Sequence, residues 1–218
     1  MNKIEAVIFD MDGVIIDSEP LYFKIQNELF NELGFSVSKS EYNSFIGSGM
    51  QLMWEKLSSK YDLHYSINQL ISMNNRLIFK TFSELPLINA TEGFHFFLNY
   101  LKELKIKTAV ASSTSKNTIN VILSRLKVIQ EFDTIVSSEE VQLGKPEPDI
   151  FLEAARRINT NPENCVVIED STLGVKAAGK AGMRCVGFTN NNSGNQDLSS
   201  ANIVVKSFSK IDLKSIIF

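Results

Sequence analysis

From residue 88 onward, short apolar segments alternate with amphipathic ones, and this alternation constrains the fold more than any other feature of the sequence. Apolar segments rich in β-branched residues are typical of buried strands, and the segments between them are typical of helices. The expected strands are 107–111, 134–136, 165–168 and 184–188, and the expected helices are 94–104, 115–126, 148–158 and 173–181. Strands that alternate with helices form a parallel sheet with helices on both faces. The sequence therefore predicts an α/β fold.

One more strand precedes this region, and a helical segment separates the two. Ala6–Phe9 is an apolar run typical of a buried strand. Residues 17–87 lack β-branched runs, and their apolar residues recur every four positions from Leu21 to Leu33, which indicates a helix with one apolar stripe. An insert at the carboxyl end of a strand hangs over any site there and can act as a lid. We expect a Rossmann-like core domain of residues 1–16 and 88–218 and an all-helical cap domain of residues 17–87.

Composition argues against several classes of protein. A net charge of −3 over 218 residues offers no basic footprint for nucleic acid, and no apolar run approaches the roughly 20 residues of a membrane helix. The first residues lack the apolar stretch of a signal peptide, so we expect a cytoplasmic protein, as a monomer or weak dimer. Cys165 and Cys185 lie in apolar runs and are expected to be buried free thiols.

Polar residues gather where the expected strands end. Because the carboxyl ends of parallel strands meet at one edge of a sheet, we expect these residues to form one site. They are Asp10 and Asp12 after the first strand, residues 112–115 after the second, Lys145 after the third, and Glu169 and Asp170 after the fourth. Acids that end a buried strand need a cation, and hard carboxylate oxygens suit Mg²⁺. The lysine and the serines suit a phosphoryl group, so we expect a small-molecule phosphate ester as the partner.

Four segments stand in a recognisable order along the chain. They are 10–14 (Asp-Met-Asp-Gly-Val), a serine at the end of the next strand, 144–149 (Gly-Lys-Pro-Glu-Pro-Asp) and 169–171 (Glu-Asp-Ser). In this order they resemble the motifs of the haloacid dehalogenase superfamily, and most closely its β-phosphoglucomutase-like phosphatases with a helical cap. The resemblance spans essentially the whole chain. It implies a phosphatase that acts on a small phosphorylated metabolite, such as a sugar phosphate, with Mg²⁺ as cofactor.

The resemblance also implies catalytic and metal-binding residues. Asp10 would be the nucleophile that forms an aspartyl-phosphate, and Asp12 would protonate the leaving group and later deprotonate water. Lys145 would neutralise charge on the nucleophile and on the transferring group. Mg²⁺ would be held by Asp10, by the main-chain carbonyl of Asp12, by Asp170, and by Glu169 directly or through water.

The phosphate-binding residues follow from the same resemblance. Ser113, Asn117 and Lys145 would contact the phosphoryl oxygens. Either Ser112 or Ser113 fits the second motif, and we choose Ser113 because it aligns when residues 115–117 are matched to the family. From the cap, the glycine-rich loop at residues 47–49 is our candidate for substrate contact through Gly47, although a plain helix–helix turn has the same composition.

Two departures from the mutase pattern favour hydrolysis. Tyr22 stands where the mutase has a histidine in its first cap helix, and Met50 stands where its cap loop carries an arginine for a second phosphate. A phosphatase needs to bind only one phosphate. Arg76 could replace the missing arginine, so a phosphosugar mutase remains the alternative. A catalytically idle binding protein is a third reading, against which the intact set of acids and Lys145 argues.

Overall fold

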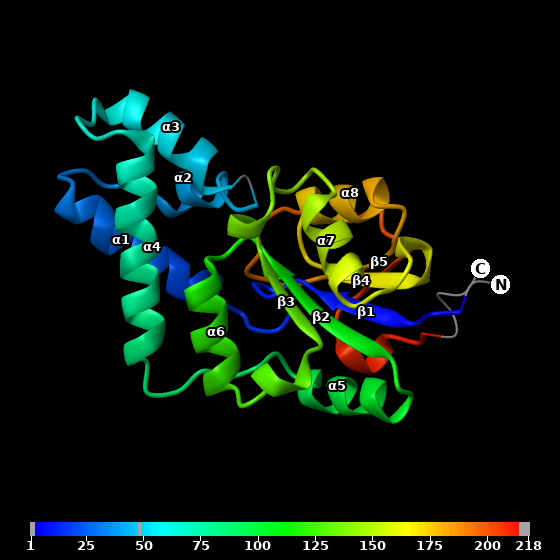
Figure 1. Cartoon of the computed structure of the whole chain (residues 1–218). Coiled ribbons are helices and arrows are strands. Elements are labelled where there is room, and N and C mark those ends of the chain that lie inside the picture. Colours follow the sequence, from blue (N-terminus) through cyan, green and yellow to red (C-terminus); the bar gives the residue numbers. More distant parts are fainter. Residues whose placement is uncertain (1–2, 48, 214–218) are drawn as a thin grey trace.

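The computed structural model describes residues 3–47 and 49–213. At its centre is a six-stranded sheet in which all neighbouring strands run parallel, in the order β3-β2-β1-β4-β5-β6 (Figure 1). The strands are β1 (Ala6–Phe9), β2 (Lys107–Ser112), β3 (Thr134–Ser137), β4 (Cys165–Glu169), β5 (Arg184–Phe188) and β6 (Ile203–Val205). The predicted Rossmann-like fold is confirmed. Only β6, a three-residue strand at the sheet edge, was not expected among these strands.

Helices cover both faces of the sheet, and further helices form a layer beside it (Figure 1). One face is covered by α5 (Phe94–Glu103) and α6 (Lys116–Arg125), and the other by α7 (Asp149–Arg157) and α8 (Thr172–Lys180). The helical layer consists of α1 (Glu19–Glu32), α2 (Lys39–Asn43), α3 (Met50–Tyr61) and α4 (Ile67–Glu84). The four helices expected after residue 88 are present, with ends within one residue of the expectation.

The residues of β1 explain why a buried strand reads as an unbroken apolar run. Val7 and Phe9 belong to the core on the α5 and α6 side, whereas Ala6 and Ile8 belong to the core on the α7 and α8 side. Successive side chains of a strand point to opposite faces of the sheet. With helices on both faces, every position must be apolar. The carboxyl end of β1 is therefore the first place where a charged side chain can stand, and Asp10 occupies it.

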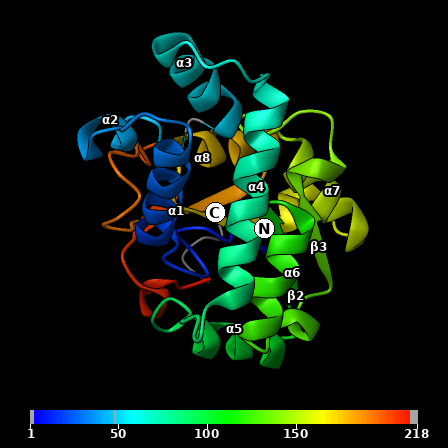
Figure 2. The same cartoon turned by 90° about the vertical axis from the view of Figure 1, so that its left-hand side faces the viewer.

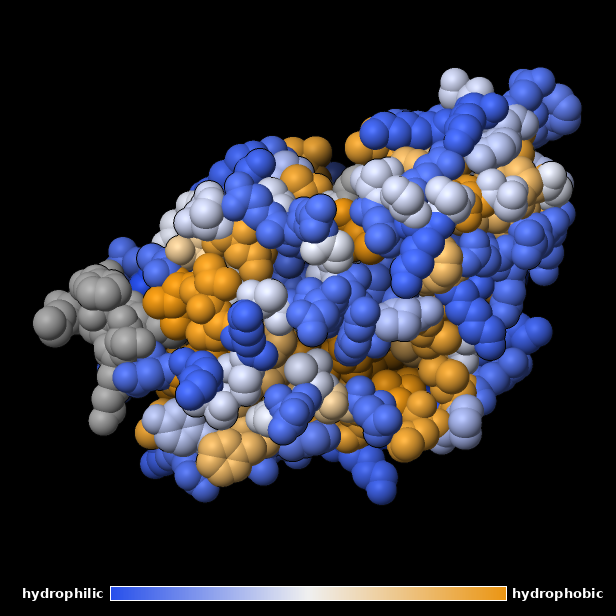
Figure 3. All heavy atoms as spheres, turned by 180° about the vertical axis from the view of Figure 1, so that it is seen from behind, coloured by the Kyte–Doolittle hydropathy of each residue, from blue (hydrophilic) through white to orange (hydrophobic). Residues whose placement is uncertain are grey.

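The helical layer has a core of its own and also packs against the sheet core. Phe30, Trp54 and Leu57 are buried within the layer, whereas Ile78 and Phe82 of α4 join the core on the α5 and α6 side. Seen from the side of the helical layer, α1 and α4 lie in front of the sheet (Figure 2). The face seen from behind is mostly polar, with apolar side chains in separate patches (Figure 3). Across the described part of the chain, no helix has the length and apolar character to span a membrane.

Candidate active site

The sheet register brings the separate motifs to one edge. Phe9 pairs with Val110 of β2 and with Ile168 of β4, so Asp10 lies level with the last residues of both neighbouring strands. The main-chain N–H of Asp10 continues this register by donating to the carbonyl of Ile168 at 2.9 Å. Residues that are more than 150 positions apart in the chain therefore meet beside β1 because of strand order alone.

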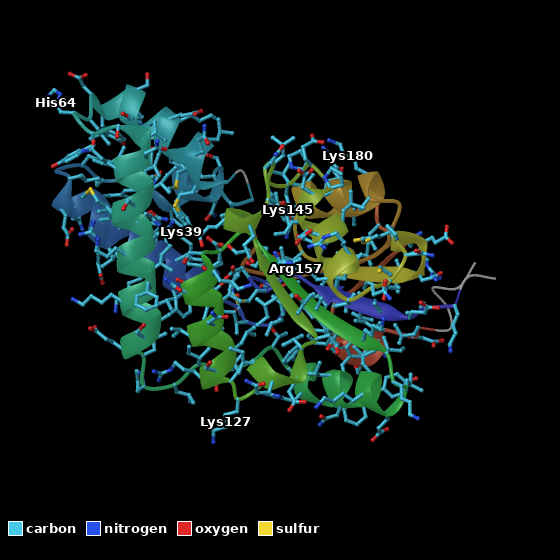
Figure 4. The ribbon with its side chains drawn as sticks, in the orientation of Figure 1. Lys39, His64, Lys127, Lys145, Arg157 and Lys180 are labelled. Carbon is cyan, nitrogen blue, oxygen red and sulfur yellow. The ribbon has the colours of Figure 1, made fainter. Side chains whose placement is uncertain are left out.

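Lys145 joins two of these carboxylates. It lies in the loop between β3 and α7, and Figure 4 shows it beside the strand ends. Its Nζ donates to Asp10 Oδ1 at 2.5 Å and to Glu169 Oε1 at 2.5 Å, with the carbonyl of Ala111 at 3.4 Å. The side chains of Lys145, Asp10 and Glu169 are all at most 8% exposed. Burial of such a cluster costs free energy, which the ion pairs between Lys145 and the two acids offset in part.

The charges of this cluster are not balanced. Burial raises the pKa of Asp10 to about 8; Lys145 lowers it, but Glu169 and Asp12 raise it further. Burial and the charges of Glu169 and Asp10 also raise the pKa of Asp170 well above its ordinary value. For Lys145, burial lowers the pKa, but Asp10 and Glu169 outweigh it and raise the pKa above its ordinary range. Burial is the largest cause of the raised pKa values of Asp10 and Asp170, and the neighbouring acids add to it, so an added cation would lower both pKa values.

Three hydroxyl groups surround the carboxylate of Asp12. Ser18 donates to its Oδ1 at 2.6 Å, Thr114 donates to its Oδ2 at 2.7 Å, and Ser112 approaches the same oxygen at 3.5 Å. The Tyr22 hydroxyl lies 3.2 Å from the Thr114 hydroxyl. Asp12 is thus held from both sides, by the start of α1 and by the loop after β2. A carboxylate that is fixed in this way can exchange a proton at a defined position.

Two glycines make room for the acids that follow β4. A Cβ on Gly174 would lie 1.8 Å from Glu169 Oε1, and a Cβ on Gly13 would lie 1.8 Å from Asp170 Oδ2. Both carboxylates therefore occupy space that only glycine leaves free. Gly13 also has a φ of +78°, which other residues rarely adopt. The contact between Gly13 and Asp170 brings the end of β4 against the turn that contains the first motif.

The donor set fits Mg²⁺. It consists of hard carboxylate oxygens, and Lys145 alone does not neutralise their charge. Mg²⁺ commonly binds one or two carboxylates and keeps several waters. Within the described ranges, no group of three or more His, Cys, Asp or Glu side chains is arranged so that it could hold a metal ion. A site made of Asp10, Asp170, the Asp12 carbonyl and waters does not require such a group. Glu169 accepts hydrogen bonds from Lys145 and Ser171 and remains a candidate ligand, directly or through water.

The structure places the expected phosphate ligands unequally. Ser112 and Ser113 both line the cavity beside the acids. Ser113 is exposed, whereas Ser112 is buried and accepts a hydrogen bond from the N–H of Thr114 at 3.1 Å. Asn117 is not brought to the cavity: it is exposed in the first turn of α6, and the next residue, Thr118, lines the cavity instead. Successive helical residues point about 100° apart, and it is Thr118 that is turned toward the cavity.

A cavity of about 260 Å³ lies between the strand ends and the helical layer. Its floor carries Asp10, Asp12, Lys145, Glu169 and Asp170, and its wall from the layer carries Glu19, Tyr22, Gln26, Tyr42, Phe45, Ile46, Gly47, Gly49, Met50, Met53, Asn75 and Ile78. Gly47 is therefore in position to contact a ligand; Ser48 lies outside the described residues. Arg76 is exposed and does not line the cavity. It is therefore not placed to take the part of the mutase arginine whose position Met50 occupies here.

Comparison with known proteins identifies a family whose match includes the segments described above. Residues 7–188 match the family described as haloacid dehalogenase-like hydrolase. The chain belongs to this family. The phosphorylated carbohydrates phosphatase of Thermotoga maritima is 35% identical over 184 residues, which cover 83% of this chain and 82% of that protein. The β-phosphoglucomutase of Bacillus subtilis is 31% identical and covers 97% of this chain and 93% of its own length.

Solved structures agree with the family assignment. The β-phosphoglucomutase from Clostridium difficile has a TM-score of 0.82 and 30% identity, over 98% of this chain and 95% of that one. The expected resemblance to β-phosphoglucomutase-like members of the haloacid dehalogenase family is confirmed. The chain is an enzyme of this hydrolase family, and its relatives include the phosphorylated carbohydrates phosphatase named above.

Sequence patterns did not identify several residues at the site of this hydrolase. Ser193 donates to Asp170 Oδ2 and is buried, although the asparagine-rich segment around it is typical of an exposed loop. Glu19 accepts a hydrogen bond from the Tyr42 hydroxyl at 2.6 Å in the cavity wall, and Gln26 is buried beside them. Glu19 is an acid in the first turn of α1, nine residues after Asp10, and could have been suspected. Tyr42 and Gln26 carry no local signal.

Proposed function

We propose that this chain is a Mg²⁺-dependent phosphatase that hydrolyses a small phosphorylated sugar through an aspartyl-phosphate intermediate. The observation that carries the proposal is the position of Asp10, which faces the cavity while Lys145 binds its carboxylate. An anionic nucleophile can approach an anionic phosphate only where positive charge offsets the repulsion. The name of the Thermotoga maritima relative supports a phosphorylated carbohydrate as the class of substrate.

In the proposed first step, a carboxylate oxygen of Asp10 attacks phosphorus and the ester P–O bond breaks. Asp12 gives its proton to the leaving alkoxide, and the hydroxyls of Ser18 and Thr114 hold the resulting carboxylate. Ser113 and Lys145 bind the phosphoryl oxygens. When bound, Mg²⁺ supplies positive charge beside the phosphoryl group.

In the proposed second step, water attacks the phosphorus of the aspartyl-phosphate. Asp12 accepts the proton of that water, the bond between Asp10 and phosphorus breaks, and inorganic phosphate leaves. Asp12 thereby regains the proton that it gave away in the first step, so a single residue serves both half-reactions. We further propose that residues 17–87 act as a cap that excludes water during the first step, because residues of this segment form one wall of the cavity above the acids.

The test measures release of inorganic phosphate from a panel of phosphomonoesters with Mg²⁺ and with EDTA. Turnover is expected only with Mg²⁺, and Asp10→Asn is expected to abolish it while the far-UV circular dichroism of the protein stays unchanged. Ser124→Ala, on the exposed side of α6, is a matched control and should keep full activity. An active Asp10→Asn protein would exclude Asp10 as the nucleophile.

A phosphosugar mutase is the second candidate, favoured by the 31% identity to the Bacillus subtilis β-phosphoglucomutase over nearly the whole chain. A mutase must hold both phosphates of a bisphosphate intermediate, and the exposed position of Arg76 leaves the cap wall without that residue's charge. Interconversion of hexose 1-phosphate and 6-phosphate, stimulated by hexose 1,6-bisphosphate, would favour the mutase. Phosphate release without interconversion would favour the phosphatase.

A further inference from the structure

The cavity wall formed by the helical layer carries hydrogen-bond acceptors without matching donors. Gln26 is 5% exposed, and among the described residues its Oε1 has no hydrogen-bond partner. Two turns earlier on α1, the half-buried Glu19 accepts a hydrogen bond from Tyr42 at Oε1, and no described residue donates to its second carboxylate oxygen. A buried acceptor that is left unpaired costs free energy, so such groups usually have a partner from protein, water or ligand.

Positive charge is scarce at the same cavity. Of the described residues that line it, Lys145 is the only Lys, Arg or His, and it is already bound by Asp10 and Glu169. Figure 4 shows His64 and Lys127 at the outer edges of the molecule. The remaining wall on the cap side is apolar or neutral, including Met50 and Ile78. A second anionic group on the substrate would therefore meet the Glu19 carboxylate and no opposing cation.

We propose that Glu19 and Gln26 form an acceptor subsite for the hydroxyl groups of the substrate's leaving group, so that the enzyme selects neutral polyhydroxy monophosphates and rejects esters with a second phosphate or a carboxylate. This inference rests on the proposed phosphatase function and narrows its substrate class. Hydroxyl groups donate to both acceptors, and the Tyr42 hydroxyl orients Glu19 toward them. Like charges in a desolvated site repel strongly, so the same carboxylate selects against anions.

The ionisation of Glu19 sets the conditions for the test. Burial raises the pKa of Glu19 to about 7; the hydrogen bond from Tyr42 lowers it, and the charges of Asp12 and Asp17 raise it again. At pH 8 most of the Glu19 side chains are carboxylates. The comparison of substrates is therefore made at pH 8.

The experiment measures kcat/KM with Mg²⁺ for three esters: p-nitrophenyl phosphate, a hexose 6-phosphate and the matching hexose 1,6-bisphosphate. The wild type is expected to prefer the monophosphate over the bisphosphate by at least about tenfold. Glu19→Gln and Gln26→Met are each expected to lower kcat/KM for the hexose monophosphate about tenfold more than for p-nitrophenyl phosphate, whose ring carries no hydroxyl. Glu19→Gln is also expected to lower the ratio of kcat/KM for the monophosphate to kcat/KM for the bisphosphate.

Glu28→Gln is the matched control, because Glu28 is an exposed acid on the same helix and does not line the cavity. It should leave all three values unchanged. Equal use of monophosphate and bisphosphate by the wild type would overturn the inference, and so would equal losses on all three esters in Glu19→Gln, which indicate a structural role. Failure of the wild type to hydrolyse any ester, including p-nitrophenyl phosphate, would refute the proposed function itself and the inference with it.

Discussion

Replacing Gly174 by alanine is expected to destabilise the protein, although alanine is the better helix former. Gly174 lies inside α8, where alanine is favoured over glycine by about 1 kcal/mol. A Cβ at this position would lie 1.8 Å from Oε1 and 1.9 Å from Cδ of Glu169. Real Cβ atoms essentially never come this close to another heavy atom, and Glu169 is fully buried. Its side chain must therefore move away from its partners.

The size of the effect follows from what Glu169 loses. Its carboxylate accepts from Lys145 Nζ at 2.5 Å, from the N–H of Ser171 at 2.7 Å and from the Ser171 hydroxyl at 2.9 Å. Separating one partner from a buried ion pair costs about 3–5 kcal/mol. After subtraction of the gain in helix propensity, Gly174→Ala should lower the free energy of unfolding by about 3 kcal/mol. For a chain of this size, that corresponds to a fall in Tm of roughly 10 °C.

The assay is urea unfolding followed by far-UV circular dichroism, together with a thermal melt. Gly179→Ala is the matched control, because Gly179 lies in the same helix and no atom would come within 4 Å of its added Cβ. This variant should be neutral or more stable by up to about 1 kcal/mol. If Gly174→Ala were as stable as Gly179→Ala, the close packing of Glu169 against α8 would not exist and the reasoning would fail.

Two other measurements test the electrostatics away from the site. Burial raises the pKa of Cys165 to about 11 and that of Cys185 further, so neither thiol should react with a disulfide reagent at pH 8 until denaturant is added; rapid reaction of the native protein would contradict their burial. Burial alone would raise the pKa of Glu140, but a backbone N–H, Lys116 and Arg157 outweigh it and lower the pKa to about 2 from 4.5. Its contribution to stability is present above pH 4.5 and is lost as the pH falls toward 2. Glu140→Gln should therefore destabilise the protein at pH 7 and have almost no effect at pH 2, as measured by urea unfolding at both values; an effect that stays constant over this range would contradict it.

The strands and the identity of the main acids could be predicted from sequence because both depend on local pattern. A strand with helices on both faces must be apolar at each position, so the first acid after Ala6–Phe9 marks the strand end. The helices could be predicted in the same way, from apolar residues that recur along one face of each helix. The order of the strands was not predicted: the structure places β1 between β2 and β4, and this order brings Asp10 and Glu169 to the same edge.

The sequence did not predict which face of each helix is turned toward the site. The resemblance pointed to Asn117 as a phosphate ligand, but the rotation of α6 places Thr118 at the cavity and leaves Asn117 exposed. Likewise, Arg76 and Asn75 are neighbours on α4, and only Asn75 lines the cavity. A rotation of 100° between successive residues decides such cases, and it depends on how the helix packs.

Sequence alone determined the α/β architecture, the helical insert after β1 and the charged groups at the strand ends, because each of these follows from periodicity within one segment. Tertiary structure decided which of those groups touch: that Lys145 binds both Asp10 and Glu169, and that Ser193 reaches Asp170 from a loop of polar residues. It also decided that Glu19 meets Tyr42 across two helices. These contacts join segments whose distance and orientation are set by packing of the whole chain, and no local pattern records them.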